Sequence, residues 1–215
     1  MKDKLQKILL RWPKRIIRDV DLAAMLTGSD NARYSLVKRA IQNKVLTRII
    51  NGVYFIEEPY AKGQFHTFEI AQMLEGSSYV SFESALSYHQ LIPEAVYTTS
   101  CATTKRTREI RTRIGVLWFK HVPTKNFFLG VERVVDGPFI YLMATPWRAL
   151  ADHYFVFQRP WTEPSSVFED LRIDEEDLRA FSLEPLRGLV REYPSPRVRR
   201  FFKQFLTYME QQHDQ

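Results

Sequence analysis

The sequence predicts an α+β protein in two parts, on three observations. Two short amphipathic segments, 19–28 and 30–43, are joined by a glycine-containing turn, which indicates paired helices near the N-terminus. Between about residues 96 and 144 the pattern changes to runs of β-branched and aromatic residues, which favour strands, and after residue 145 the helical period returns. We therefore expect a module at 1–60, followed at 61–215 by a mixed α+β part with a small, mainly antiparallel sheet and C-terminal helices.

The composition excludes several classes of protein. The single cysteine, Cys101, rules out an intramolecular disulfide and a multi-cysteine zinc site. The longest apolar run is the six residues Phe139 to Ala144, far below the roughly 18 that span a bilayer. The charged N-terminal residues lack the apolar stretch of a signal peptide. We therefore expect a cytoplasmic protein.

The net charge of +6 is unevenly distributed along the chain. Residues 1–60 carry 12 Lys and Arg against 6 Asp and Glu, whereas residues 161–215 carry 8 against 11. The basic excess therefore belongs to the first part of the chain. A local field of this sign favours a polyanionic partner, although a solvated surface would have the same composition.

Each element of the first part has its own local pattern. Leu5, Ile8 and Leu9 have helical spacing within 3–11, which predicts a first helix ahead of those at 19–28 and 30–43, with Asp30 as the N-cap of the last. The runs 45–50 and 53–56 favour strands, and Asn51-Gly52 between them favours a type I′ hairpin turn. Helix, helix, turn, helix and hairpin together predict a winged helix-turn-helix module that binds DNA.

The outer face of the predicted third helix carries side chains suited to the major groove of DNA. Asn and Gln form paired hydrogen bonds with adenine, and Lys and Arg reach guanine or phosphate. Arg33 falls nearer the buried sector, so we leave it out. The predicted DNA-binding residues are Asn31, Ser35, Lys38 and Gln42 on the outer face, Tyr34 and Arg39 on its flanks, and Arg48 and Asn51 on the hairpin.

The second part alternates helical and strand patterns. Helices are expected at 65–74, at 81–90 with Ser81 as N-cap, and from Thr145-Pro146 through residue 154. Strands are expected at 79–80, 96–104, 115–122, 127–135 and 138–144, with a hairpin turn at Asp136-Gly137. Two further helices are expected at 173–191 and 196–212.

A basic segment lies between two of these strands, and we expect a long, exposed hairpin connection there. We predict that it contacts the phosphates of DNA or RNA, while a solvated loop is the alternative. Its basic residues are Lys105, Arg106, Arg108, Arg111 and Arg113.

No pattern of catalytic residues stands out, so we expect no enzyme, no cofactor and no metal site. The histidines lack metal-ligand spacing, and no glycine-rich phosphate-binding motif is present. Cys101 is expected to be buried in a strand. The carboxylates Glu69, Glu83, Asp136 and Asp152 show no spacing that favours a metal, and Asp152 with His153 are expected to be structural.

Five segments of the chain, in order, resemble one known family. They are Val45-Leu-Thr-Arg-Ile-Ile-Asn-Gly-Val-Tyr54, Tyr79-Val-Ser-Phe-Glu-Ser-Ala-Leu-Ser-Tyr-His-Gln-Leu-Ile92, Ala102-Thr-Thr-Lys-Arg106, Phe119-Lys-His-Val122 and Ala144-Thr-Pro-Trp-Arg-Ala-Leu-Ala-Asp152. The chain resembles the AbiEi antitoxins of type IV toxin–antitoxin and abortive-infection systems over roughly residues 5–155. One departure is Gln90, where the family has glycine after the histidine.

The resemblance implies a DNA-binding repressor of its own operon that also counteracts a nucleotidyltransferase-type toxin, with no requirement for a stable complex between them. It implies a role in phage defence. Two other functions stay open from the sequence: a non-enzymatic adaptor whose winged helix binds protein, and a nuclease or transferase with an unrecognised site. Whether the chain binds its operator as a homodimer also stays open.

Overall fold

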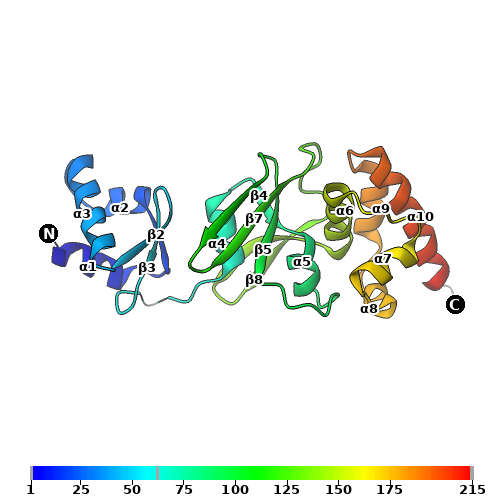
Figure 1. Ribbon diagram of the computed structural model, residues 1–215, viewed down its shortest axis with the longest axis horizontal. Coiled ribbons are helices and arrows are strands. Elements are labelled where there is room, and N and C mark those ends of the chain that lie inside the picture. Colours follow the sequence, from blue (N-terminus) through cyan, green and yellow to red (C-terminus); the bar gives the residue numbers. More distant parts are fainter. Residues whose placement is uncertain (1, 62, 214–215) are drawn as a thin grey trace. The chain divides into compact units, whose positions relative to one another are not determined.

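The computed structural model describes residues 2–61 and 63–213, and the chain divides into two compact units, Met1–His66 and Thr67–Gln215. The division falls six residues after the boundary predicted from the sequence. Within the described residues there are ten helices and two sheets, so the protein belongs to the α+β class (Figure 1). Each unit has a hydrophobic core of its own.

The first unit packs three helices against a three-stranded antiparallel sheet. Its elements are α1 (Lys2–Arg11), β1 (Ile16–Arg18), α2 (Asp19–Met25), α3 (Asp30–Gln42), β2 (Leu46–Ile50) and β3 (Val53–Ile56). β3 lies between the other two strands, in the order β1-β3-β2. Leu9, Leu22 and Leu36, one from each helix, meet Ile17 and Ile56 of the sheet in the core.

Two details of this unit differ from the prediction. β1 was not expected, because three residues with two apolar side chains are too few to show an alternating pattern. Ser29, rather than Asp30, is the N-cap of α3, since its Oγ accepts a hydrogen bond from the Ala32 N–H at 3.3 Å.

The hairpin of β2 and β3 forms as predicted, but its turn is not of type I′. Gly52 has a φ of +75°, whereas Asn51 does not have the positive φ that a type I′ turn requires. The strand register shifts by one residue between Arg48 and Ile50. A left-handed glycine beside a one-residue bulge is typical of a type I turn followed by a bulge.

The second unit contains the remaining elements. Its first half comprises α4 (Thr67–Leu74), β4 (Ser78–Val80), α5 (Phe82–Tyr88), β5 (Thr98–Thr103), β6 (Arg108–Thr112), β7 (Gly115–His121), β8 (Val131–Asp136) and β9 (Phe139–Ala144). Its second half comprises α6 (Pro146–Phe157), α7 (Pro164–Leu171), α8 (Glu175–Arg179), α9 (Glu184–Glu192) and α10 (Pro196–His213).

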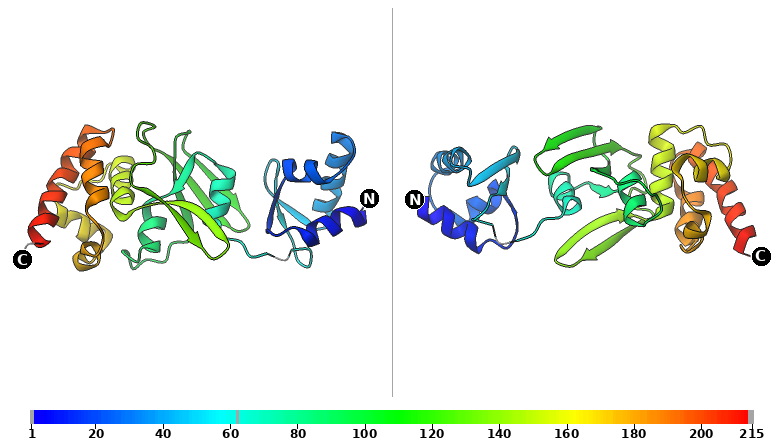
Figure 2. Two further views of the ribbon diagram at one scale, coloured as in Figure 1. Left: turned by 180° about the vertical axis from the view of Figure 1, so that it is seen from behind. Right: turned by 60° about the horizontal axis from the view of Figure 1, so that its bottom comes forward.

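The strands of this unit form one mixed sheet, in the order β6-β7-β5-β4-β9-β8. β5 is parallel to β7, and β4 is parallel to β9, while the other neighbouring pairs are antiparallel. Three of the five neighbouring pairs are antiparallel, so the expectation of a mainly antiparallel sheet is confirmed, while the two parallel pairs are a detail that it did not include. β5 and β7 are parallel because the chain passes from β5 to the outer edge of the sheet, forms β6 there, and turns back into β7, which lies between β6 and β5. In Figure 2 the terminal hairpins, β6–β7 and β8–β9, diverge from the centre of the sheet.

The predicted loop at 105–113 is largely a strand. Residues 108–112 form β6, which pairs antiparallel with β7, Ile110 lying opposite Leu117. The segment carries more charge than most strands, and this composition favours a loop in a prediction from the sequence. Charged residues are, however, a common feature of edge strands, where they oppose pairing with other chains.

The strand predicted at 127–135 begins only at Val131. Phe127 lies in the preceding turn, where its buried ring packs against Tyr79 with centroids 4.9 Å apart. Gly130 ends the turn at a φ of +70°, and a Cβ at this position would lie 3.2 Å from Arg148 Cβ. Glycine is therefore required there both by conformation and by space.

A seam runs through the middle of the sheet, where two strands meet along very little backbone. β4 and β9 are joined at a single register pair, Val80 and Met143. Next to this pair, the Gln72 side chain of α4 accepts from the Leu142 N–H at 2.9 Å and donates to the Leu142 carbonyl at 2.6 Å. His89 Nε2 donates to the Ala144 carbonyl at 2.9 Å. Side chains thus take the place of a neighbouring strand on β9.

The C-terminal helices pack around α6. As predicted, Thr145 caps α6 by accepting from the Arg148 N–H, and Pro146 occupies its first turn. Figure 1 shows α6 between the sheet and the pair α9 and α10. α7 was not predicted. The expected helix 173–191 is divided into α8 and α9, because Pro185 has no N–H to donate to the carbonyl of residue 181 and is tolerated only in the first turn of a helix.

In the described part of the chain, no helix has both the length and the apolar character needed to cross a bilayer.

Candidate nucleic-acid interface

The predicted recognition face of α3 is exposed along its whole length. Leu36, Val37 and Ala40 are buried against the rest of the first unit, which leaves the opposite side of the helix to solvent. All of the predicted residues on α3 and the hairpin are exposed: Asn31, Tyr34, Ser35, Lys38, Arg39, Gln42, Arg48 and Asn51.

Five of these eight residues line one groove, which lies between α2, α3 and the hairpin of β2 and β3. The groove has a volume of about 650 Å³. Tyr34, Lys38 and Gln42 line it from α3, and Arg48 and Asn51 line it from the hairpin. The structure therefore brings helix and hairpin residues together around one concave surface.

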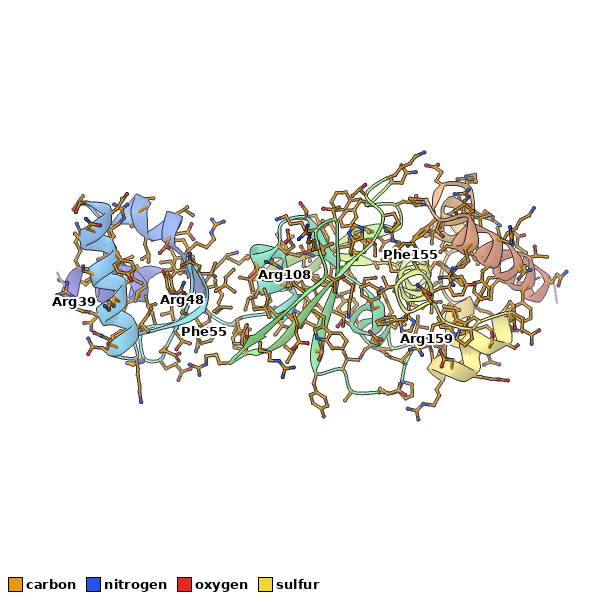
Figure 3. All side chains as sticks on the ribbon, turned by 45° about the horizontal axis from the view of Figure 1, so that its top comes forward. Arg39, Arg48, Phe55, Arg108, Phe155 and Arg159 are labelled. Carbon is orange, nitrogen blue, oxygen red and sulfur yellow. The ribbon has the colours of Figure 1, made fainter. Side chains whose placement is uncertain are left out.

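The other three predicted residues lie outside this groove. Arg39 instead lines a small cavity between α1 and α3, and its Nε donates to the Ser35 carbonyl at 3.2 Å. Successive helical residues are rotated by about 100°, so Arg39 cannot share a flank with its neighbour Lys38. Asn31 and Ser35 lie on the outer face, beside the groove and not in it. Arg39 and Arg48 can be compared in Figure 3.

Some residues of the groove were not selected from the sequence. Arg33 lines it, but its guanidinium donates to the Gly28 carbonyl at 3.0 Å and is paired with Asp30. Val20 of α2 lies at the same groove and is 64% exposed. The residues of α3 that line the groove follow helical spacing, at positions 30, 33, 34, 37, 38, 41 and 42. Helical spacing alone does not select this face of α3, because the choice depends on where the hairpin lies.

Asp19 connects α2 to the hairpin at the base of the groove. Its N–H donates to the Gly52 carbonyl at 2.9 Å, and a Cβ on Gly52 would lie 3.1 Å from Asp19 Oδ2. Its carboxylate accepts from the Tyr54 hydroxyl, and burial together with this bond raises the pKa of Tyr54 to about 12. Tyr54 therefore remains a hydrogen-bond donor at neutral pH, and the position of the hairpin relative to α2 is fixed.

The groove contains three basic and two acidic side chains. The acids are Asp19, which accepts from Tyr54, and Asp30, which is paired with Arg33. Arg48 donates to the amide oxygen of Asn51, a neutral group, and so keeps its charge. Lys38 and Arg48 are the cations that the groove presents to a partner.

The basic segment of the second unit is partly committed to contacts within the protein. Glu75 is 1% exposed, and its carboxylate lies 2.8 Å from Lys105 Nζ and 3.1 Å from an Arg108 nitrogen. Arg108, labelled in Figure 3, also covers the Phe119 ring. Two of the five predicted cations thus neutralise a buried acid.

The other three cations of the segment are exposed. Arg111 pairs with Glu109 at 2.6 Å, on the same edge strand. Arg106 and Arg113 lie in the turns on either side of β6. The segment therefore does not form the continuous electropositive loop that the sequence suggested.

The other residues considered for chemistry are buried or make contacts within the second unit. Cys101 is buried in β5, and burial raises the pKa of its thiol far above neutrality. The buried Asp152 accepts hydrogen bonds from four side chains. His153 Nε2 lies 3.1 Å from a carboxylate oxygen of Glu83. Among the residues described, no group of three His, Cys, Asp or Glu side chains is placed to hold a metal ion.

No model of a known protein family matches the chain, and no curated protein matches it either.

Proposed function

We propose that the first unit is a winged helix-turn-helix module through which the chain binds double-stranded DNA and represses its own operon. The observation that carries the proposal is the element order α1-β1-α2-α3-β2-β3, with the strands arranged β1-β3-β2. In such modules the second helix of the pair enters the major groove and the hairpin contacts the backbone beside it. Here α3 is that helix, and the hairpin of β2 and β3 is the wing.

The exposed residues have distinct roles in this proposal. Asn31 and Gln42 carry amides that pair with adenine, and Lys38 reaches guanine or phosphate. Arg48 and Asn51 on the wing contact phosphates and fix the register of the module on the duplex. Ser35 on the outer face and Arg39 on the flank away from the groove are suited to phosphates of the opposite strand.

A gel-shift titration with the DNA upstream of the chain's own gene tests this proposal. We expect binding that weakens steeply as the salt concentration rises, because bound lysines and arginines release counterions from the phosphates. Lys38→Ala should lower the slope of log K against log salt by about one. Gln42→Ala should weaken binding to the preferred sequence more than to unrelated DNA.

Lys7→Ala is the matched control, since Lys7 is an exposed lysine of α1 outside the groove. This variant removes the same charge and should leave the preference for the upstream sequence unchanged. Absence of binding at low salt would contradict the proposal. That result would favour an adaptor that binds protein, an alternative consistent with the apolar side chains in the groove.

We further propose that the chain is a cytoplasmic, non-enzymatic antitoxin against a nucleotidyltransferase-type toxin. This rests on the resemblance of residues 5–155 to the AbiEi antitoxins. A nucleotidyltransferase gene should lie beside the gene for this chain, and co-expression of the chain should restore growth that the toxin arrests. Failure of co-expression to restore growth would contradict this second proposal and leave the first intact.

The two activities can be separated by variants. Lys38→Ala with Gln42→Ala should lose DNA binding but still restore growth, since these residues belong to the first unit. The basic segment of the second unit is the candidate for antagonism, through Arg106, Arg111 and Arg113. Charge reversal of Arg106 and Arg111 should reduce the restored growth without unfolding the protein.

A further inference from the structure

We propose that the groove of the first unit reads A·T base pairs through the 5-methyl group of thymine, with Tyr34 and Val20 as the residues that contact the methyl. This inference rests on the proposed function, because it names a feature of the duplex that the same site recognises. It gives Tyr34 a specific role in the site and adds Val20, an apolar residue that phosphate binding does not require.

Tyr34 and Val20 are apolar or aromatic side chains that the first unit leaves largely exposed to solvent. Tyr34 is 70% exposed and Val20 is 64% exposed. They belong to α3 and α2 respectively, and both line the groove. Ala23, Val37 and Ile41 line the same groove with further apolar side chains. The groove therefore presents an apolar strip beside the outer face of the proposed recognition helix.

The charges around the strip favour duplex DNA as its occupant. Lys38 and Arg48 lie on the groove as cations, and each reaches it from a different element, α3 or the wing. Asp30 is neutralised by Arg33, and Asp19 is occupied by the Tyr54 hydroxyl. The arrangement matches a duplex, in which phosphates flank a groove floor of base edges.

An apolar strip discriminates among base edges. A phosphate oxygen would lose its hydration against Val20 or against the ring of Tyr34 without gaining a hydrogen bond there, so the apolar part of the strip opposes phosphate. In the major groove, the thymine methyl is the apolar group that base pairs present. The adenine of the same pair presents the atoms that an Asn or Gln amide recognises. Asn31 and Gln42 beside the strip therefore suit the same base pair.

The experiment compares duplexes that differ only in this methyl group. The full-length chain is used to enrich one duplex from a random-sequence pool, and that duplex is then synthesised with deoxyuridine in place of every thymidine. We expect the wild-type chain to bind the deoxyuridine duplex about fourfold more weakly for each methyl contacted.

Two variants test whether the named residues are responsible. Tyr34→Ala and Val20→Ala should each bind the thymidine duplex more weakly and should bring the ratio between the two duplexes close to one. Leu10→Ala is the matched control, because Leu10 is a partly exposed apolar residue of α1 away from the groove. It should keep the wild-type ratio.

The outcomes are distinguishable. If no duplex is enriched, the proposed DNA-binding function fails, and this inference with it. If a duplex is enriched but thymidine and deoxyuridine forms bind equally, DNA binding stands and thymine reading is overturned. If the deoxyuridine duplex binds more weakly by the same factor in wild type and in both variants, the methyl is read elsewhere, and the assignment to Tyr34 and Val20 is overturned.

Discussion

Asp152 is a charged residue that the core of the second unit holds completely out of water. Its carboxylate accepts from Tyr79 at 2.7 Å, Ser81 at 2.9 Å, Arg148 at 2.9 Å and Tyr193 at 3.1 Å. Burial, together with the nearby carboxylate, raises the pKa of both tyrosines, so that they remain donors. Ser81 occupies the N-cap position of α5 that the sequence predicts, but its hydroxyl donates to Asp152 and does not cap the helix.

We expect Asp152→Asn to lower the free energy of unfolding of the second unit by about 3–5 kcal/mol, because it leaves the Arg148 guanidinium buried without a counter-charge. Urea denaturation measures the change. Asp177→Asn, at an exposed position of α8, should change it by less than about 0.5 kcal/mol. Equal effects of the two substitutions would contradict a structural role for Asp152.

His89 makes the stability of the second unit depend on pH. Burial lowers its pKa below the ordinary value of 6.5, against the opposing effects of its bond to the Ala144 carbonyl and of Glu132. Protonation therefore favours the unfolded chain. The contribution of neutral His89 is fully present above pH 6.5 and is lost as the pH falls below that value.

We accordingly expect the urea midpoint of the second unit to fall between about pH 7.5 and about pH 5.5. His89→Gln, which has no titratable group, should show a smaller fall over the same range. A wild-type midpoint that stays constant, or one that falls equally in the variant, would show that His89 is not responsible.

At the scale of elements, β6 is an edge strand whose basic side chains are paired with acidic residues. One of these acids lies outside the strand and one lies within it. Glu75, at the end of α4, holds Lys105 and Arg108, and Glu109 holds Arg111. An edge strand with this many charges resists pairing with a second chain. The same cations therefore contribute to folding as well as to any interaction with a partner.

We expect Arg108→Glu to destabilise the second unit by about 1–3 kcal/mol, because it removes a charge-assisted bond to the buried Glu75 and adds a like charge beside it. Thermal denaturation followed by circular dichroism measures the change. Arg106→Glu is the matched control, and its melting temperature should stay close to that of the wild type. A larger loss in Arg106→Glu would overturn this account of β6.

The elements that the sequence predicts correctly are those specified by adjacent residues. Thr145-Pro146 begins α6, and Asp136-Gly137 joins β8 to β9, because caps and turns depend on a few neighbours. The exposed face of α3 follows from helical periodicity in the same way. Gln90 follows α5 with a positive φ of +60°, a conformation that glycine adopts readily.

The features that escape the sequence depend on distant neighbours. The parallel pairing of β5 with β7 is decided by where β6 docks. Likewise, which residues of α3 line the groove depends on the position of the hairpin beside the helix. Val20 cannot be selected from the sequence for the same reason. A single exposed apolar residue of α2 becomes a candidate only because the fold places it at the same groove as Tyr34 of α3.

At the scale of the whole molecule, the two units have independent cores. The buried apolar residues of the first unit, Leu9 and Ile17 among them, form one cluster. Those of the second unit, which include Leu150 and Phe202, form another. Because no buried residue belongs to both clusters in the described part of the chain, loss of one core does not remove contacts from the other.

We therefore expect two separable unfolding transitions in differential scanning calorimetry. Leu9→Ala, which empties a fully buried site of the first core, should lower one transition by an amount that corresponds to about 2–5 kcal/mol. Leu150→Ala should lower the other. A single transition that moves in both variants would show that the two cores unfold cooperatively.

The seam between β4 and β9 has a mechanical consequence. A backbone ladder shares a load among many hydrogen bonds, but here one register pair and the side chains of Gln72 and His89 carry it. Tension between the two ends of the sheet would concentrate on that line. The second unit would tear there first, into a four-stranded piece that keeps β4 and a two-stranded hairpin of β8 and β9.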